Sequence, residues 1–258
     1  MNGLELDRIT KRFGRVTVAD ELTLSVRHGD AVGVVGPNGA GKTSLFGMIS
    51  GDLRPDAGEV RFDGHRVTLL DPSVRCRLGI GRTYQVPRPF LRMSVFENTL
   101  VAAQQGARAR GRASYALAAR VLGETGLADL AGRPAAQLGL LQRKRLELAR
   151  ALATRPKLLL LDEVAGGLTD PEVTELVALI TAARERDGLA VLWIEHVVRA
   201  LTATVDRLIC LAGGRVIGDG RPLEVLASAA VKDVFLGTEA TADALTEAGL
   251  GPDDDQRA

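Results

Sequence analysis

The stretch GVVGPNGAGKTSLFGMISG, residues 33–51, decides the fold of this chain. It holds the spacing GxxxxGK(S/T), which is filled by Gly36, Gly41, Lys42 and Thr43. A β-type run, AVGVVG, enters the loop, and a run of helical character leaves it. A strand, a glycine-rich loop and a helix in this order predict a phosphate-binding loop within an α/β protein.

The residue types of this loop suit phosphate chemistry. Its glycines allow backbone conformations that turn N–H groups toward phosphate oxygens at the positive end of a helix. Lys42 adds a charge for the β and γ phosphates, and the hydroxyl of Thr43 is suited to ligate Mg²⁺. An accidental match is expected in about one chain in a hundred of this size, so nucleotide binding is the stronger interpretation. The predicted nucleotide-binding residues are Gly36, Pro37, Asn38, Gly39, Ala40, Gly41, Lys42, Thr43 and Ser44.

Runs of β-type and helical residues alternate along most of the chain. Apolar β-type runs that follow helical stretches predict a parallel sheet buried on both faces. Between about residues 87 and 152 the pattern changes to helices rich in Ala, Leu and Arg, which predicts a helical lobe inserted into the core. We therefore expect a core over about 1–86 and 153–237, and an acidic, mobile tail over 238–258. The expected β-type runs are residues 3–13, 22–36, 58–67, 157–164, 190–196 and 207–220.

Composition and charge are those of a globular chain, with 46% hydrophobic residues among 258. With 33 Lys and Arg against 32 Asp and Glu, the net charge gives no global electrostatic reason to expect nucleic acid or an anionic membrane surface as a partner, so any such partner must be found locally. Cys76 and Cys210 lie far apart without metal-type spacing, which is typical of a reducing compartment. No apolar run approaches the roughly 20 residues of a membrane span, and the N-terminus lacks the order of a signal peptide. We expect a cytoplasmic chain that reaches a membrane only through another subunit.

Two acidic residues follow a run of buried character. The segment KLLLLDEV, residues 157–164, predicts a core strand that ends at Asp162 and Glu163. Side chains at the carboxyl end of a parallel strand lie beside the nucleotide crevice of an α/β sheet. Asp162 is placed to hold Mg²⁺, directly or through water, and Glu163 to orient and deprotonate the attacking water. Alone, the pair would fit a solvated acidic turn, but the phosphate loop favours the catalytic interpretation.

Two further polar residues stand where a strand or the core ends. His196 follows the run AVLWIE, and we interpret it as a γ-phosphate contact rather than a structural histidine. Gln85, in GRTYQVPRPF, stands where the core gives way to the helical lobe. Its amide oxygen is able to reach Mg²⁺ or the attacking water, which would link nucleotide state to lobe orientation. Taken alone, Gln85 would be an ordinary loop residue.

These pieces in this order resemble the ATP-binding subunit of an ATP-binding-cassette (ABC) transporter, over about residues 4–237. The resemblance implies a phosphate-loop NTPase fold: a RecA-like parallel-sheet core with an antiparallel β subdomain and an inserted helical subdomain, binding ATP and Mg²⁺. Phe13 falls at the position whose aromatic ring stacks on adenine in the family, where Tyr is usual. The remaining matches are Gln85 as the Q-loop, Asp162 as the magnesium aspartate, Glu163 as the catalytic glutamate and His196 as the switch histidine.

Within that family the chain is most similar to the ATPases of branched-chain amino-acid uptake systems. The segments that carry this similarity are residues 81–102, 145–173, 193–201 and 231–237. The resemblance implies an ATPase subunit that couples ATP hydrolysis to transport, lying on the inner face of the cell membrane against integral-membrane permease subunits. A separate solute-binding protein would select the transported molecule together with the permease.

The chain departs from the family at two sites. After Glu163 the family usually has Pro and then an Asp or Asn in the segment that crosses to the partner ATPase. This chain has Val164 and Thr169 there. Thr169 keeps a hydroxyl without a charge, so cross-talk through it is in question. The second site is the signature LSGGQ, which in this chain reads Leu138, Gly139, Leu140, Leu141 and Gln142.

The altered signature bears on the partner. The missing serine hydroxyl removes a hydrogen bond to a charged group, typically about 1.5–3 kcal/mol, although the helix N-terminus keeps its positive dipole. The resemblance implies two ATPase subunits arranged head to tail, with each nucleotide between the phosphate loop of one subunit and the signature of the other. The altered signature would therefore act on the partner's ATP. The resemblance therefore implies a heterodimer with a second, signature-bearing ABC ATPase rather than a homodimer.

Two other functions stay open on the sequence. A soluble ABC-type ATPase acting on nucleic acid or the ribosome commonly has two cassettes or a long coiled-coil insertion, whereas this chain has one phosphate loop. A regulatory nucleotide binder that barely hydrolyses ATP would not need Glu163. We interpret the arginines around Gln85 as solvated loop charge or as a permease-docking surface; they are Arg75, Arg77, Arg82, Arg88 and Arg92.

Overall fold

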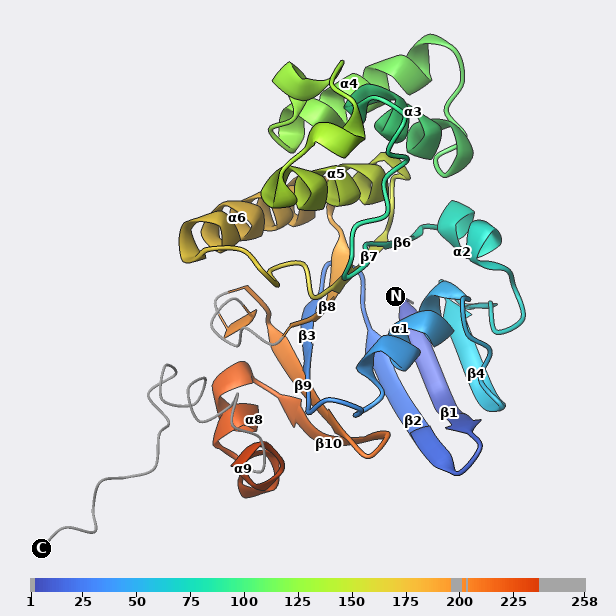
Figure 1. Ribbon diagram of the computed structural model, residues 1–258. Helices are drawn as coiled ribbons and strands as arrows, with labels where there is room; N and C mark the ends of the chain where they lie inside the picture. The colour runs from blue at the N-terminus through green and yellow to red at the C-terminus, as the bar shows by residue number, and fades with distance from the viewer. Residues whose placement is uncertain (1–2, 196–200, 203, 237–258) are drawn as a thin grey trace, which may run out of the picture.

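The computed structural model describes residues 3–195, 201–202 and 204–236, and within them the core is built on a six-stranded sheet (Figure 1). The strand order is β10-β9-β3-β8-β7-β6, in which β10 runs antiparallel to β9 and the other neighbours are parallel. This confirms the α/β fold with a parallel core. The strands are β3 (Ala31–Val35), β6 (Ile80–Arg82), β7 (Leu158–Asp162), β8 (Ala190–Ile194), β9 (Arg207–Ala212) and β10 (Arg215–Gly220).

Apolar side chains fill both faces of this sheet, because successive residues of a strand point to opposite sides. In β7, Leu159 and Leu161 pack into one apolar cluster, and Leu158 and Leu160 into another. The first cluster joins the sheet to the helical lobe, and the second joins it to α1 and a second sheet. The apolar run that sequence analysis assigned to a doubly covered strand is therefore buried throughout.

A smaller antiparallel sheet covers α1 (Lys42–Ser50) on the side away from the core sheet (Figure 1). Its order is β2-β1-β4-β5. Phe46 and Ile49 of α1 are buried in the cluster that contains both sheets, so the helix that follows the phosphate loop is clamped between them. The strands are β1 (Leu4–Phe13), β2 (Val16–Val26), β4 (Ala57–Phe62) and β5 (His65–Arg66).

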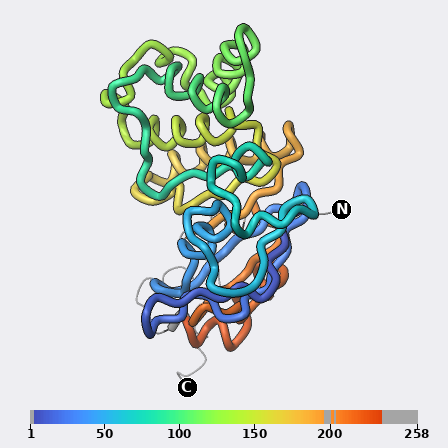
Figure 2. Tube along the Cα trace, turned by 90° about the vertical axis from the view of Figure 1, so that its right-hand side faces the viewer, coloured from blue at the N-terminus to red at the C-terminus, as the bar shows by residue number. Residues whose placement is uncertain are grey.

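The helical lobe lies at the end of the molecule opposite the antiparallel sheet (Figures 1 and 2). It contains α3 (Val95–Gln105), α4 (Arg112–Glu124) and α5 (Leu140–Ala153), with short 3₁₀ turns at Ala128–Leu130 and Ala135–Gln137. Among the described helices, none combines the length and apolar character that a membrane span requires. The remaining helices are α2 (Pro72–Leu78), α6 (Asp170–Asp187), α8 (Pro222–Ala227) and α9 (Ala229–Leu236).

Arg75 of α2 is a structural residue, so the prediction that it is a solvated loop charge is wrong. Its side chain is buried and donates to the carbonyl oxygens of Met48 and Ile49 at 2.6 and 2.9 Å. It also donates to those of Thr68 and Leu70 at 2.9 Å each. The last carbonyls of a helix lack partners within the helix, and Arg75 supplies them at the end of α1. Burial lowers the pKa of Arg75 to about 10.

Candidate active site

The phosphate loop joins β3 to α1 and forms the floor of a cavity of about 190 Å³. Val18 of β2 and Glu163, which follows β7, complete the walls. Sequence analysis did not identify Val18, because a valine within a strand gives no chemical signal. The loop residues that line the cavity are Asn38, Gly39, Ala40, Gly41, Lys42, Thr43 and Ser44.

Two glycines let the loop lie against the neighbouring strands. A Cβ atom on Gly36 would stand 2.1 Å from the carbonyl oxygen of Leu211, which belongs to β9. At Gly41 a Cβ atom would stand 2.1 Å from the carbonyl oxygen of Val18, and the φ angle there is +99°. Only glycine fits either position, so the loop takes a fixed path around its cavity.

Lys42 is 6% exposed and lies across the loop. Its Nζ donates to the carbonyl oxygens of Gly36 and Pro37 at 2.6 and 3.0 Å. Burial lowers the pKa of Lys42, while the carboxylates of Glu163 and Asp162 act in the opposite direction. The first residues of α1 follow a glycine without a capping side chain, so their N–H groups face the cavity at the positive end of the helix. The loop is therefore suited to bind an anion.

Asp162 ends β7 and is held by an arginine whose role sequence analysis missed. Its Oδ2 accepts a 2.9 Å hydrogen bond from Nη2 of Arg82. Nη1 of the same guanidinium donates to Asp52 and to the hydroxyl of Ser50, at 3.0 Å each. Burial raises the pKa of Asp162, and the hydrogen bond from Arg82 lowers it. Arg82 is therefore a buried partner of the site and not the solvated charge that we predicted.

Gln85 and Glu163 are brought together although 78 residues separate them: the side-chain amide of Gln85 donates to the Glu163 carboxylate. The backbone of Glu163 is also held on both sides. Its N–H donates to the carbonyl oxygen of Ile194 at 2.9 Å, and its carbonyl oxygen accepts from Nζ of Lys144 at 3.3 Å. Glu163 has a φ angle of +47°, which is uncommon for a residue with a side chain and concentrates at functional sites.

The residues at the signature position form the start of α5. Gly139 is the N-cap, and its N–H donates to the side-chain oxygen of Gln142 at 3.2 Å. Leu138 is buried, whereas Leu140 is 47% exposed at the first helical position. A Cβ atom on Gly139 would meet nothing within 4 Å, and its φ angle of −69° suits any residue. The helix N-terminus is thus open, with a leucine where the family has glycine.

Two of the other predicted positions take structural roles. Thr169 is the N-cap of α6, and both its N–H and its hydroxyl donate to the carboxylate of Glu172 at 2.8 Å. These bonds lower the pKa of Glu172. Val164 is buried in the core.

Phe13 lies at the end of β1, 51% exposed, and does not line the cavity over the phosphate loop. Nζ of Lys11 stands 5.4 Å from the centre of its ring. His196 and the acidic tail over 238–258 lie outside the described residues.

The oxygen donors of the site suit a magnesium ion. Within the described residues no three His, Cys, Asp or Glu side chains gather at one point. Mg²⁺ prefers one or two carboxylates together with water and the phosphates of a substrate, rather than a cage of protein ligands. Asp162 at the end of β7 and the exposed hydroxyl of Thr43 in the loop fit such a set.

Comparisons with known proteins agree with this geometry. A family model described as ABC transporter matches residues 19–166. The high-affinity branched-chain amino acid transport ATP-binding protein BraF of Pseudomonas aeruginosa is 34% identical, over 91% of this chain and 97% of its own. The lipopolysaccharide export system ATP-binding protein LptB of Escherichia coli is also 34% identical, over 93% and 99%. A crystal structure of the ADP conformation of an ATP-binding cassette superimposes with a TM-score of 0.82 at 29% identity, over 92% of this chain and all of that one.

Proposed function

Because this chain belongs to the ABC transporter family, as an ATP-hydrolysing ATP-binding subunit, we propose that it powers the import of branched-chain amino acids or related small amphipathic solutes. The observation that carries this proposal is the 34% identity to BraF across 91% of the chain. The integral-membrane permease subunits form the solute pathway, and a solute-binding protein delivers the solute to them. The chain itself acts from the inner face of the membrane.

The loop and the two carboxylates divide the work on the nucleotide. Lys42 exchanges the carbonyl oxygens of Gly36 and Pro37 for the β- and γ-phosphate oxygens of ATP. Glu163 orients the attacking water and accepts its proton. Gln85, which donates to Glu163 in the described structure, turns its amide toward the nucleotide and so reports nucleotide state to the helical lobe. His196 is assigned to the γ-phosphate, and the exposed ring of Phe13 to the adenine.

Asp162, Thr43 and Gln85 would hold Mg²⁺ at this site. When bound, the ion neutralises charge on the β and γ phosphates. Arg82 orients Asp162 for this role, because one of its nitrogens holds the carboxylate while the other is anchored to Ser50 and Asp52.

The partner ATPase is a different chain in this proposal. The start of α5 has no serine hydroxyl for the partner's γ-phosphate, and the exposed Leu140 occupies a position where glycine allows close approach. The hydroxyl of Thr169, the other group that would cross to the partner, is already bonded to Glu172. A homodimer would repeat these features at both nucleotides, whereas a heterodimer confines them to one.

Contact with the permease is supported by apolar side chains at the junction of core and lobe. Val86, Phe90 and Leu91 are large, exposed and close together in sequence. Phe90 also lines a groove of about 210 Å³ between α2 and α3, together with Val101 and Ala102. Exposed apolar groups that gather in this way are typical of protein interfaces.

Co-purification followed by reconstitution tests the proposal. The chain serves as bait in mild detergent, and we expect two permease-type membrane proteins and a second ATPase. The recovered complex, placed in proteoliposomes with a solute-binding protein, should accumulate leucine when supplied with ATP, and Glu163→Gln should abolish accumulation without releasing any subunit. Recovery of soluble partners alone would contradict the proposal.

Lipopolysaccharide export is the second candidate, because LptB of Escherichia coli matches at 34% identity over 93% of the chain. The same complex distinguishes the two functions. An exporter would transfer lipopolysaccharide to an acceptor at the expense of ATP and would be indifferent to leucine and to a solute-binding protein.

A further inference from the structure

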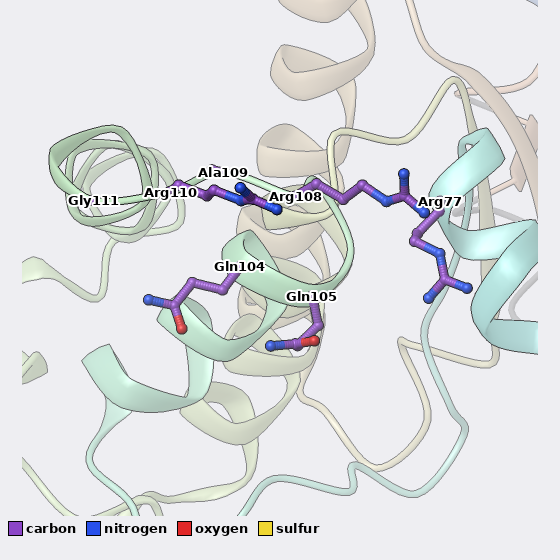
Figure 3. Close-up of a pocket in the computed structure, with 7 residues that line it drawn as sticks. All are labelled: Arg77, Gln104, Gln105, Arg108, Ala109, Arg110 and Gly111. Atoms are coloured by element: carbon purple, nitrogen blue, oxygen red, sulfur yellow. The ribbon is translucent and has the colours of Figure 1, made fainter.

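A second cavity, of about 490 Å³, opens on the helical lobe, away from the phosphate loop (Figure 3). Arg77 of α2 stands on one side, and the end of α3 and the loop that leads to α4 form the other. In Figure 3 the side chain of Arg108 extends from this loop toward Arg77. The residues that line the cavity are Arg77, Gln104, Gln105, Arg108, Ala109, Arg110 and Gly111.

The charge of this cavity is of one sign. Its lining has three guanidinium groups and no carboxylate. Residues 98–123 contain four arginines and no Asp or Glu at all, in a chain whose overall net charge is +1. Among the described residues Arg77, Arg108 and Arg110 form no ion pair, and the one side-chain bond of Arg77 is a 3.5 Å contact with Ser73. Grouped cations without counter-charges create a positive potential that favours an anion.

Backbone hydrogen bonds fix the loop that carries Arg108 and Arg110. The N–H of Gly106 donates to the carbonyl oxygen of Ala102 at 2.9 Å, and that of Ala109 donates to the carbonyl oxygen of Ala103 at 3.1 Å. The loop is thereby tied to the last turns of α3, with Arg108 at a φ angle of +55°. The lobe side of the cavity is therefore fixed at the level of the backbone.

We infer that this cavity binds the phosphate group of an anionic phospholipid at the membrane surface. Guanidinium groups bind phosphate oxygens in a bidentate manner, and the amides of Gln104 and Gln105 supply further donors. The lining offers no aromatic or large aliphatic side chain, which a protein partner would use as an anchor. The inference rests on the proposed function in one respect: Arg77 and Gln105 also line the groove assigned to the permease, which brings this face to the membrane.

Vesicle binding by the isolated full-length chain tests the inference. Vesicles made of phosphatidylglycerol and phosphatidylcholine in equal parts should retain the chain in flotation assays, and phosphatidylcholine alone should not. Arg108→Gln with Arg110→Gln should weaken the partition by about thirtyfold, since each basic residue near an anionic membrane contributes about fivefold. Raising the salt to about 1 M should abolish retention of the unaltered chain, because the Debye length then falls to about 3 Å.

The control is a second double variant that also loses two arginines, at positions outside the cavity. Arg27→Gln with Arg221→Gln removes two exposed arginines, neither of which lines the cavity. This variant should keep its partition within about twofold of the unaltered chain. Equal losses in the two double variants would show that net charge alone is responsible and would overturn the inference. Urea unfolding of each variant establishes that it is folded.

A soluble probe separates the membrane from other anions. Short-chain phosphatidylglycerol should shift the NMR resonances of the Arg77, Arg108 and Arg110 side chains, and inorganic phosphate should do so more weakly. Saturation by inorganic phosphate without vesicle binding, or binding to an acidic peptide instead of vesicles, would overturn the membrane assignment. Because no permease is present, these results do not depend on whether the chain imports amino acids.

Discussion

Arg82 and Gln85 each hold a carboxylate of the phosphate site from a position outside the strand that carries it. Arg82 gives Asp162 a 2.9 Å hydrogen bond inside the core, and Gln85 donates to Glu163. Both contacts join residues about 80 positions apart. Asp162 is buried, and a buried carboxylate keeps its charge only when a partner such as Arg82 is present.

Arg82→Gln should shift the pH dependence of ATP hydrolysis. Burial raises the pKa of Asp162 and Arg82 opposes that effect, so removing Arg82 raises this pKa further. An ionised Asp162 is needed to hold the metal, and activity on the acid side should therefore be lost at a higher pH. We expect kcat at neutral pH to fall about tenfold, from the loss of a charged hydrogen bond.

The measurement for this variant is the initial rate of phosphate release against pH, at saturating ATP. Asp52→Asn is the control, because it removes the outer partner of Arg82 and leaves the bond to Asp162 in place. An acid limb that does not move in Arg82→Gln would show that Asp162 is held without it.

Glu163→Gln should slow hydrolysis by about 10²–10⁴, the usual contribution of a general base. ATP binding should persist, because Lys42 and the loop are untouched. Equilibrium binding of a fluorescent ATP analogue and the rate of phosphate release measure the two effects separately. Unchanged phosphate release would favour the regulatory nucleotide binder that the sequence leaves open.

Among the elements, the start of α5 and the end of α1 each form a hydrogen bond with a side chain that completes the helix end. The start of α5 has only half of a capping box, because Gln142 reaches back to Gly139 and glycine offers no side chain in return. Arg75 of α2 closes the far end of α1 with two hydrogen bonds, to Met48 and Ile49, and gives two more to the segment that precedes α2.

Gly139→Ser should be tolerated and should restore function at the partner's nucleotide. The added side chain meets nothing within 4 Å and would serve as an N-cap, with a gain of about 0.3 kcal/mol over glycine. The hydroxyl would face the partner's ATP. In a mixed assembly whose own site is silenced by Glu163→Gln, residual phosphate release should rise several-fold.

Gly139→Ala is the control for this restoration, since it fills the same space without a hydroxyl. Equal rates for the serine and alanine variants would mean that the start of α5 does not reach the partner's nucleotide.

Arg75→Met should destabilise the fold by roughly 3 kcal/mol, because several buried carbonyl oxygens lose their donor. Arg77→Met, in the same helix but exposed, should change stability by less than about 0.5 kcal/mol. Urea unfolding followed by circular dichroism measures both free energies. Similar losses for the two variants would contradict the structural role given to Arg75.

At the scale of the whole molecule, the core sheet is buried on both faces, and its one cysteine, Cys210, lies in the middle of β9. Burial raises the pKa of Cys210 from 9.0 to about 11. In the unfolded chain this thiol ionises near the ordinary value, while in the fold it stays protonated. Its contribution to stability is therefore full below pH 9 and is lost as the pH rises from about 9 to 11.

Between pH 9 and 11 the free energy of unfolding should fall by roughly 2–3 kcal/mol less in Cys210→Ala than in the unaltered chain. Urea unfolding at a series of pH values measures the slope for the two chains. In the native chain the thiol should also resist alkylation at neutral pH until unfolding exposes it. Parallel pH profiles for the two chains would contradict the assigned pKa.

Much of this architecture follows from sequence pattern, because local rules generate it. The loop over residues 36–44 predicts its own strand and helix, and the leucines of 158–161 predict a doubly covered strand. The three residues of β6 escape prediction, since they are too few to display a strand pattern. Sequence motifs identify the site residues that stand at a fixed spacing from one another along the chain, such as those of the phosphate loop.

Partners that are distant in sequence leave no such pattern. The sequence predicts that Arg75 and Arg82 are solvated, because their neighbours in the sequence do not indicate the carbonyl and carboxylate groups that bind them in the fold. Long-range packing decides these two cases, and a single sequence does not encode it in any local spacing. The bond from Thr169 to Glu172 is a different case, because the two residues stand three positions apart, in the Thr-x-x-Glu spacing of a capping box.

The bond from Lys144 to the carbonyl oxygen of Glu163 gives α5 two tasks at once. In the head-to-tail arrangement proposed above, the first turn of this helix contacts the partner's ATP. Its second turn, through Lys144, donates a hydrogen bond to the peptide group of Glu163, the general base of this chain. Any tilt of the helix would then be felt at both nucleotides in the same instant. The two nucleotide sites would therefore be coupled directly through α5. This one rigid helix, rather than signals relayed through the membrane, would set the order in which the two ATP molecules are hydrolysed.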